Sequence, residues 1–274
     1  MTGEQKYRKA ALLLRKQLLT HPRTREGGFW HKKVYPHQMW LDGIYMGQPF
    51  YAEWSSRFKE NNYDDIAKQF VILEKHARDD RTGLLYHGWD ESGEQRWADK
   101  TTGHSPNFWG RAMGWYGMAL VDVLDFIPKN HPQRPVLIAI LQRYVAAVAK
   151  VQHPANGLWY QVLDQAEVKG NYPEASASSM FVYTMAKALN NSYVDSAYLS
   201  VVNNGFLGIQ KQFLTYDSES HIHLNSTVQV SGLGGTPYRD GTVPYYLSEP
   251  VITDDAKGMG AFILCAAEMS KLNR

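Results

Sequence analysis

Two kinds of helical segment alternate along the chain. In the first kind one face is apolar and the other is charged, as in residues 5–20, where Tyr7, Leu14 and Leu18 share a face opposite lysine and arginine. Segments of the second kind are apolar on nearly every side. This alternation is typical of helical hairpins arranged in a ring, with buried inner helices and half-exposed outer helices. We therefore expect an all-α fold of about eight helices, with amphipathic members at 5–20, 62–79, 134–152 and about 194–214.

A sequence repeat precedes two of the apolar segments. Each copy begins with Gly-Leu-x-Tyr and continues with a polar residue, an aspartate three positions further on, a polar loop, a proline and an apolar helix. The loops that enter the inner helices of a ring gather on one face, so we expect residues far apart in the sequence to meet there. The copies are marked by Gly83, His87 and Asp90, and by Gly157, Gln161 and Asp164.

The stretch from Gly27 to Phe50 is the strongest candidate for the place where chemistry occurs. Its second half predicts a helix that begins near Pro36, is buried nearly all round, and is kinked or broken at residues 47–49. Asp42 interrupts this helix, and an ionised carboxylate in an apolar setting must be paired, hydrogen-bonded or shifted in pKa. A raised pKa would suit a group that both gives and takes a proton. The plainer alternative is an aspartate that caps the helix or pairs with a neighbour.

Signals for β-structure are sparse. Residues 221–232 alternate polar and apolar positions and contain β-branched side chains, which predicts a short hairpin. The glycine-rich segment 232–241 lacks the GxGxxG order and the lysine of a phosphate-binding loop. We interpret it as a rim loop and not as a nucleotide site.

The composition narrows the possible partners. The net charge is +2 and no basic run is long enough to predict a nucleic-acid or membrane-surface site. Cys265 is the single cysteine of the sequence, so no intrachain disulfide can form, and it fits a small core residue. His221 and His223 lack a companion metal-ligand motif, and we expect no metal and no other cofactor. No apolar stretch approaches the roughly 20 residues of a membrane span, and the first residues carry no signal-like segment, which predicts a cytoplasmic protein. Homo-oligomerisation is left open.

Aromatic residues make up 13% of the chain, more than a core alone requires. Sugar rings stack on aromatic faces, so a carbohydrate ligand fits this composition, although packing between helices accounts for many of these rings. The loops add a protonatable carboxylate, imidazoles and a guanidinium, which together favour an acidic sugar. Arg111 lies among aromatics and needs an anionic partner, which could be a substrate carboxylate or a structural Asp or Glu. The polar candidates are His31, Lys32, His37, His87, Asp90, His104 and Arg111, and the aromatic ones are Trp30, Trp40, Trp89, Trp109 and Trp115.

Five phrases, in this order, resemble the unsaturated rhamnogalacturonyl hydrolases of glycoside hydrolase family 105. They are GGFWHK, YPHQMWLDGIYMGQPF, YHGWDES, FWGRAMGWY and SEPVITDDAKGMGAF. The resemblance covers most of the chain and implies an (α/α)6-type helical toroid, a ring of six α/α hairpins. We expect residues 1–274 to form a single toroid domain that lacks the N-terminal hairpins of that ring, because only 26 residues precede the GGFWHK loop.

The resemblance also implies a reaction and a set of roles. Family members hydrate the C4=C5 double bond of a terminal unsaturated galacturonyl residue, which releases it from a rhamnogalacturonan oligosaccharide. Asp42, in WLDG, corresponds to the general acid and base. The residues that fall where the family binds its sugar are His31, Lys32, Trp40, His87, Arg111 and Trp115.

Two alternatives stay open from the sequence. One is a family 88-like hydrolase that acts on unsaturated glucuronyl ends. The other is a non-catalytic carbohydrate-binding relative that keeps the ring and its aromatics. They differ in whether Asp42 supports turnover.

Overall fold

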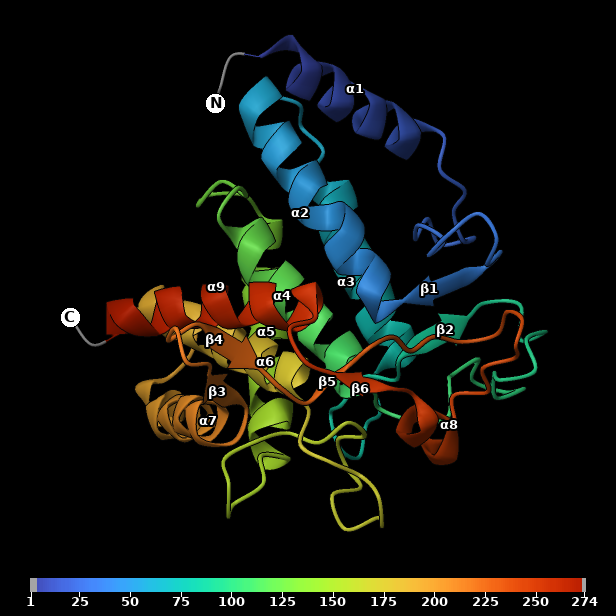
Figure 1. Cartoon of the computed structure of the whole chain (residues 1–274). Coiled ribbons are helices and arrows are strands. Elements are labelled where there is room, and N and C mark those ends of the chain that lie inside the picture. Colours follow the sequence, from blue (N-terminus) through green and yellow to red (C-terminus); the bar gives the residue numbers. More distant parts are fainter. Residues whose placement is uncertain (1–3, 273–274) are drawn as a thin grey trace.

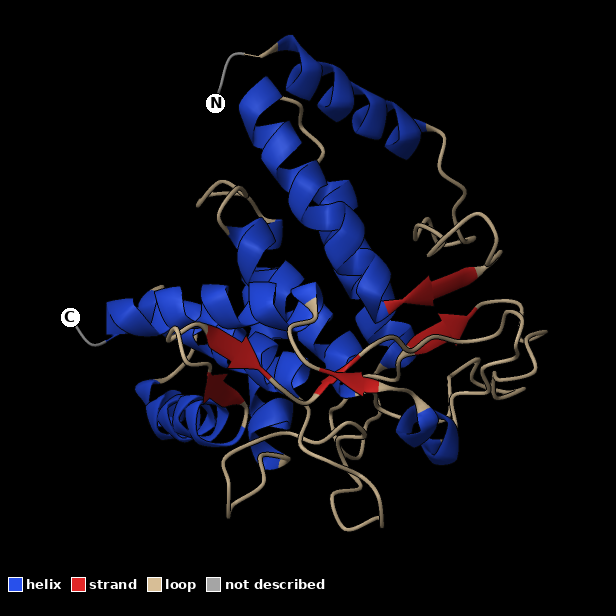
Figure 2. Cartoon of the chain, in the orientation of Figure 1, coloured by secondary structure: helices blue, strands red, loops and turns tan. Residues whose placement is uncertain are grey.

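The computed structural model describes residues 4–272, and this part of the chain is mostly helical (Figure 1). Figure 2 shows the strands as short separate pairs that form no common sheet. The predicted all-α class is therefore confirmed. The described residues form nine α-helices, namely α1 (Gln5–Leu19), α2 (Leu41–Phe58), α3 (Tyr63–Ala77), α4 (Gly110–Leu124), α5 (Gln133–Lys150), α6 (Ala175–Asn190), α7 (Leu199–Gln212), α8 (Val243–Ser248) and α9 (Ala256–Leu272).

The helices form two layers. The inner helices α2, α4, α6 and α9 pack against one another in that order, and α3, α5 and α7 cover them from outside. The sequence explains the division, because α4 and α6 are apolar on nearly all sides and bury almost every side chain. The predicted toroid arrangement of inner and outer helices is confirmed. Within residues 4–272 the inner helices form an arc of that ring with α2 at one end and α9 at the other.

Helix α2 differs from its prediction in three respects. It begins at Leu41 instead of near Pro36, because the preceding residues form the short strand β1 (Gln38–Trp40). It continues through Pro49 without the predicted break, since a proline removes only one backbone hydrogen bond and residues on both sides of it, Gln48 and Tyr51, are buried. It is also not buried all round, as Met46 is 60% exposed.

The strands are paired differently from the predicted hairpin. β1 pairs antiparallel with β2 (Gly88–Asp90). β3 (Leu214–Tyr216) pairs with β4 (Ile222–Leu224), and β5 (Thr227–Val228) pairs with β6 (Val251–Ile252). A hairpin confined to residues 221–232 is therefore wrong, because β4 pairs with an earlier segment and β5 with a later one.

The repeat has a structural counterpart. Gly83 and Gly157 each turn the chain after an outer helix with positive φ, 79° and 71°, a conformation that favours glycine. In the first copy the carbonyl of His87 accepts a hydrogen bond from the first residue of α2, and in the second the carbonyl of Gln161 accepts one from the first residue of α4. The repeated loops therefore meet the N-terminal ends of successive inner helices, as the sequence predicted.

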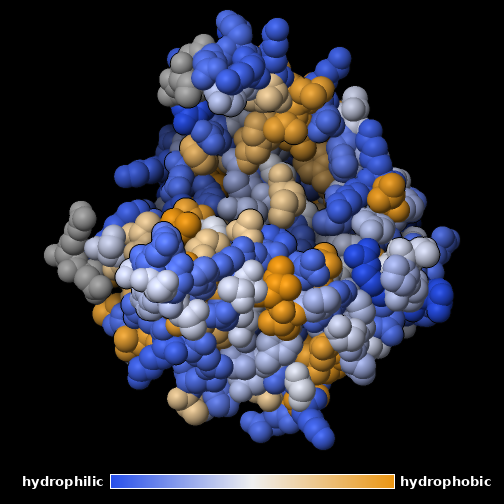
Figure 3. Space-filling model, viewed as in Figure 1, coloured by the Kyte–Doolittle hydropathy of each residue, from blue (hydrophilic) through white to orange (hydrophobic). Residues whose placement is uncertain are grey.

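Helix α1 packs weakly on the rest of the chain. None of its residues is buried, and Tyr7 and Leu14 of its predicted packing face are 55% and 47% exposed. An ion pair joins Arg15 of this helix to Glu60, with 2.7 Å between Nη2 and Oε2. Figure 3 shows apolar surface gathered between α1 and α2. No helix of the described residues is both long and apolar enough to span a membrane.

Candidate active site

Asp42 lies in the first turn of α2, where the positive end of the helix dipole favours a negative charge. Trp40 precedes the helix in extended conformation and directs the chain into it from β1. The Asp42 side chain is 16% exposed. Its Oδ2 atom is buried without a well-aligned hydrogen bond, so this oxygen retains the capacity to accept or carry a proton.

His87 is the partner of Asp42. The imidazole is fully buried, and its Nε2 lies 3.2 Å from Asp42 Oδ2, close enough for an ion pair although not aligned as a good hydrogen bond. The other nitrogen, Nδ1, lies 2.8 Å from the hydroxyl of Tyr246. The first turn of α2, the loop before β2 and the short helix α8 thus contribute Asp42, His87 and Tyr246 to one row of side chains.

This environment sets the pKa of Asp42. Burial alone would raise the pKa, but the contact with His87, then the charges of His87 and His31, more than offset burial and hold the pKa of Asp42 below its usual value. Burial lowers the pKa of His31 to about 3, so His31 is uncharged near neutral pH and His87 is the effective partner. The structure therefore contains the paired carboxylate considered from the sequence, and not the raised pKa.

A stack of rings forms the wall beside this carboxylate. His31 stacks on Trp40 with ring centroids 4.2 Å apart and planes 12° apart, and Tyr35 stacks on Trp40 with a centroid distance of 4.8 Å. Trp40 is 5% exposed, so it supports the stack from within. Lys32 follows His31 in the same loop and is exposed at its rim.

Trp115 lies on α4, about one helical turn after Arg111. Its ring stacks on Tyr45 with a centroid distance of 4.6 Å, and Tyr45 is one turn along α2 from Asp42. Both rings are partly exposed. Trp115 therefore lies beside the predicted site, with one face covered by Tyr45.

Arg111 occupies the second position of α4, as Asp42 does on α2. It is 1% exposed, its Nε donates to Ser176 Oγ at 2.8 Å, and its Nη atoms donate to backbone carbonyls of Val228 and Gln229. Glu174 Oε1 lies 3.5 Å from Nη2. Of the two partners considered for Arg111, the structure contains a structural glutamate, and a role in binding substrate stays a prediction.

Two further residues were not identified from the sequence. Glu174 is fully buried and accepts hydrogen bonds from Ser176 Oγ, Ala177 N and Val228 N, which makes it the cap of α6 and the counter-charge of Arg111. Its position before an apolar helix, equivalent to Trp40 and Trp109, was an available signal. Tyr246 carries no such signal, because only the tertiary fold brings it to His87.

The other polar candidates lie outside this group. The Asp90 carboxylate accepts hydrogen bonds from Ser92 and Gln95, which fixes its own loop. His37 is exposed, and His104 stacks on Tyr86 with a centroid distance of 4.6 Å. These residues therefore shape loops and do not touch Asp42. Residues 4–272 contain no group of three or more His, Cys, Asp or Glu side chains that could hold a metal.

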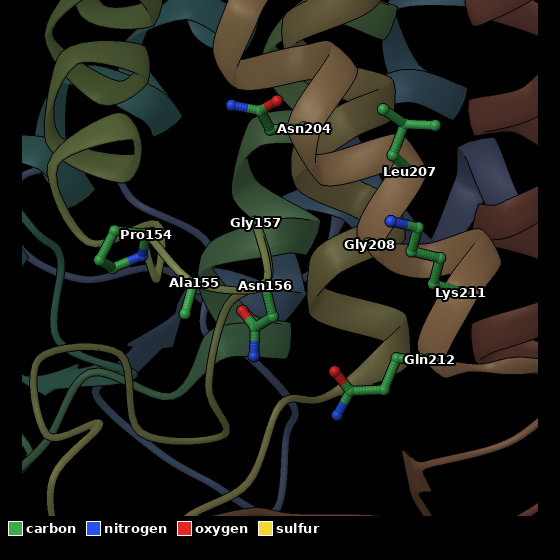
Figure 4. A pocket seen from close by; sticks show the side chains of 9 residues that line it. All are labelled: Pro154, Ala155, Asn156, Gly157, Asn204, Leu207, Gly208, Lys211 and Gln212. Carbon is green, nitrogen blue, oxygen red and sulfur yellow. The ribbon is translucent and has the colours of Figure 1, made fainter.

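The large pockets of the described residues lie away from Asp42. A small cavity of about 20 Å³ is lined by residues that include His31, Trp40 and Gly43, and Asp42 is not among them. A pocket of about 500 Å³ opens between α7 and the loop after α5, and its lining contains neither an aromatic ring nor a carboxylate (Figure 4). A second pocket, of about 510 Å³, has a lining that includes Trp97, Asp99 and His104, and neither pocket includes Asp42. The lining of the pocket between α7 and the loop after α5 is Pro154, Ala155, Asn156, Gly157, Asn204, Leu207, Gly208, Lys211 and Gln212.

Comparison with known proteins identifies the family and the fold. The family model described as Glycosyl Hydrolase Family 88 matches residues 1–273. A solved structure of a family 105 glycoside hydrolase from C. acetobutylicum superposes with a TM-score of 0.97 and 49% sequence identity, covering 98% of this chain and 75% of that one.

Two curated relatives are also similar. Protein Atu3128 of Agrobacterium fabrum is 40% identical over 237 residues, which cover 84% of this chain and all of that protein. The unsaturated rhamnogalacturonyl hydrolase YesR of Bacillus subtilis is 27% identical over 213 residues, covering 74% of this chain. The match spans 58% of the length of YesR.

Proposed function

The chain belongs to glycosyl hydrolase family 88 and is a relative of family 105, and we propose that it releases a terminal 4,5-unsaturated galacturonyl residue from rhamnogalacturonan oligosaccharides. The reaction is hydration of the C4=C5 double bond. The finer choice of substrate is supported by the similarity to YesR and by the quoted motifs.

Asp42 acts as general acid and then as general base. It gives a proton to C4 of the unsaturated ring and takes one from the water whose oxygen adds to C5. The elements of water are thereby added across the double bond, and the carboxyl group of Asp42 returns to its protonated starting state. The hemiketal formed at C5 then opens, and the link to the neighbouring sugar is lost. One carboxyl group is sufficient for this sequence, unlike the two of ordinary glycosidases.

The observation that carries the proposal is the pair formed by Asp42 and His87. Because the pKa of Asp42 is held low, the proton that it delivers needs a nearby store, and His87 Nε2 at 3.2 Å can share that proton. Asp42 Oδ2 has no aligned hydrogen bond beyond this contact with His87, so the carboxylate is not fixed by structural donors. A carboxylate that served only to cap or brace a helix would have its oxygens occupied, as those of Glu174 are.

The remaining predicted residues surround this pair. The stack of His31 on Trp40 offers a wall for the sugar, and Trp115 offers a ring one turn away. Lys32, exposed at the rim, can meet the uronate directly. Arg111 can do so only if the bound substrate draws it from Glu174, because its present contacts are all internal.

The test follows the ultraviolet absorbance of the conjugated C4=C5 uronate in lyase-treated rhamnogalacturonan, with the wild-type chain and with Asp42→Asn. We expect the absorbance to decay with the wild type, and the rate to fall by about 10²–10⁴-fold in the variant, the range for losing a general acid or base. Melting curves check that both proteins are folded.

Two outcomes would count against the proposal. Absorbance that persists while the sugar binds would identify a non-catalytic binder. Faster decay with unsaturated glucuronyl oligosaccharides than with the pectin-derived ones would keep the reaction and replace the substrate.

A further inference from the structure

We infer that Tyr246 is a positioning residue for the reaction: its hydroxyl holds His87 Nδ1, so that Nε2 of the same ring faces the carboxylate of Asp42. The inference rests on the proposed function, since it assigns Tyr246 a role in the chemistry of Asp42. The distances are 2.8 Å from the hydroxyl to Nδ1 and 3.2 Å from Nε2 to Oδ2. Tyr246 and His87 are both fully buried.

Tyr246 is itself held in place. Its ring stacks against Trp109 with planes 19° apart, and its backbone carbonyl accepts a hydrogen bond from Gln161 Nε2 at 3.2 Å. Gln161 Oε1 in turn accepts one from Trp109 Nε1 at 3.0 Å. The hydroxyl therefore has little freedom to leave His87, and the polar residue of the second repeat supports the polar residue of the first.

A tyrosine hydroxyl suits this place chemically. It can accept from Nδ1–H both when the imidazole is charged and when Nε2 has passed its proton to Asp42, so one contact serves both states of the shared proton. Burial holds the pKa of Tyr246 well above its usual value, so the hydroxyl keeps its proton. In both states Nε2 faces Asp42, and the shared proton lies either on Nε2 or on the carboxyl group. The imidazole can then share a proton with the carboxylate without turning.

Without the hydroxyl, Nδ1 of His87 would be buried without a partner. Such a nitrogen disfavours the charged imidazole more than the neutral one, because a buried unpaired charge costs more than a buried unpaired polar atom. The pair of His87 and Asp42 would then hold its proton less readily. The loss affects the chemical step and leaves the sugar-binding surfaces unchanged.

The experiment compares Tyr246→Phe with Tyr245→Phe. Tyr245 precedes Tyr246 in α8, and its hydroxyl accepts a hydrogen bond from Gly232 N instead of contacting His87, so it is the matched control. For Tyr246→Phe we expect kcat to fall about tenfold, the order for one lost buried hydrogen bond, with KM changed by less than about twofold. The control should keep both constants. Melting curves should be close to wild type for both, since each ring is retained.

A second readout does not depend on activity. In ¹⁵N-labelled protein, the Nδ1 resonance of His87, assigned by its loss in His87→Gln, should move in Tyr246→Phe and stay in Tyr245→Phe. In the His87→Gln background, Tyr246→Phe should lower kcat no further.

The two readouts separate the possible failures. A stationary Nδ1 resonance, an unchanged kcat, or an equal further loss of kcat in the His87→Gln background would each overturn the role of Tyr246. If no unsaturated substrate is turned over, the proposed function fails. The resonance still decides whether Tyr246 positions His87.

Discussion

The N-termini of α2 and α4 are built alike and used differently. Each begins after an extended tryptophan, Trp40 or Trp109, and each has its first amide bound by the polar residue of a repeat loop. The second residue is Asp42 in α2 and Arg111 in α4. Asp42 keeps an oxygen without a hydrogen bond, whereas Arg111 donates to a hydroxyl and to carbonyls and lies beside a carboxylate.

The difference separates the position that we propose to be reactive from a structural position on the same scaffold. The helix dipole favours an anion at this position and disfavours a cation. Arg111 is therefore tolerated because Glu174 and the carbonyls of Val228 and Gln229 surround it. Asp42 needs no such enclosure, and its Oδ2 has only the contact with His87.

Removing Arg111 should destabilise the folded chain, because the N-terminus of α4 has a structural role in this comparison. Arg111→Ala leaves Glu174, which is fully buried, as an uncompensated charge. We expect the free energy of unfolding to fall by about 3–5 kcal/mol, measured by urea denaturation. Arg143→Ala, which removes an exposed pair with Glu74 at 2.7 Å, is the control and should cost less than about 1 kcal/mol. A loss for Arg111→Ala no larger than the control would strengthen its role as a uronate ligand.

Replacing the polar residue of the first repeat by that of the second tests the catalytic role proposed for the N-terminus of α2. His87→Gln introduces the residue of the second copy, Gln161, which has no titrating proton to share with Asp42. The rate should fall by about 10²-fold, the lower end for proton transfer, while the free energy of unfolding changes by about 1 kcal/mol. Steady-state kinetics and urea denaturation measure the two effects. An unchanged rate would mean that Asp42 works without His87.

Two tryptophans, Trp115 of α4 and Trp54 of α2, should differ in their effect on substrate affinity. Trp115→Ala should weaken substrate binding by about 1–3 kcal/mol through the loss of one stacking surface, measured by titration calorimetry with Asp42→Asn protein to prevent turnover. Trp54→Ala removes a buried ring near the other end of α2 and should leave affinity unchanged. Equal affinity for both variants would assign Trp115 to packing against Tyr45.

The smallest expected effect is a pH dependence of stability. Because the pKa of Asp42 is below its unfolded value of about 3.9, its ionised form stabilises the folded chain above that value, and the contribution is lost as pH falls through the folded-state pKa. Urea denaturation of wild type and Asp42→Asn should therefore show wild type relatively more stable at neutral pH than at about pH 3. A gap that widens toward acid would mean that burial, and not His87, dominates the pKa.

Much of the fold could be predicted from the sequence because helix periodicity is local information. The amphipathic and apolar segments became the outer and inner layers, and the repeated loops were found at the helix N-termini. The start of α2 was misplaced because the pairing of β1 with β2 joins segments far apart in the chain. The hairpin at 221–232 failed for the same reason.

The candidate site was predictable only in part. Asp42 was conspicuous as a charge in an apolar helix, but its partner is 45 positions away, and neither periodicity nor spacing can supply a distance. The enclosure of Arg111 needed Glu174 and a carbonyl of β5 together in space. Tyr246 could not be predicted from the sequence, because only the tertiary fold brings its hydroxyl to His87.

The bond between Tyr246 and His87 has a consequence for the order in which the molecule is built. Inner helices that pack in chain order form mostly local contacts, so successive hairpins can fold as they leave the ribosome. Tyr246 is 159 positions from His87. The imidazole therefore gains its second contact only after α8 has docked, so the inner helices α2 and α4 can fold before the proposed catalytic group of Asp42, His87 and Tyr246 is complete.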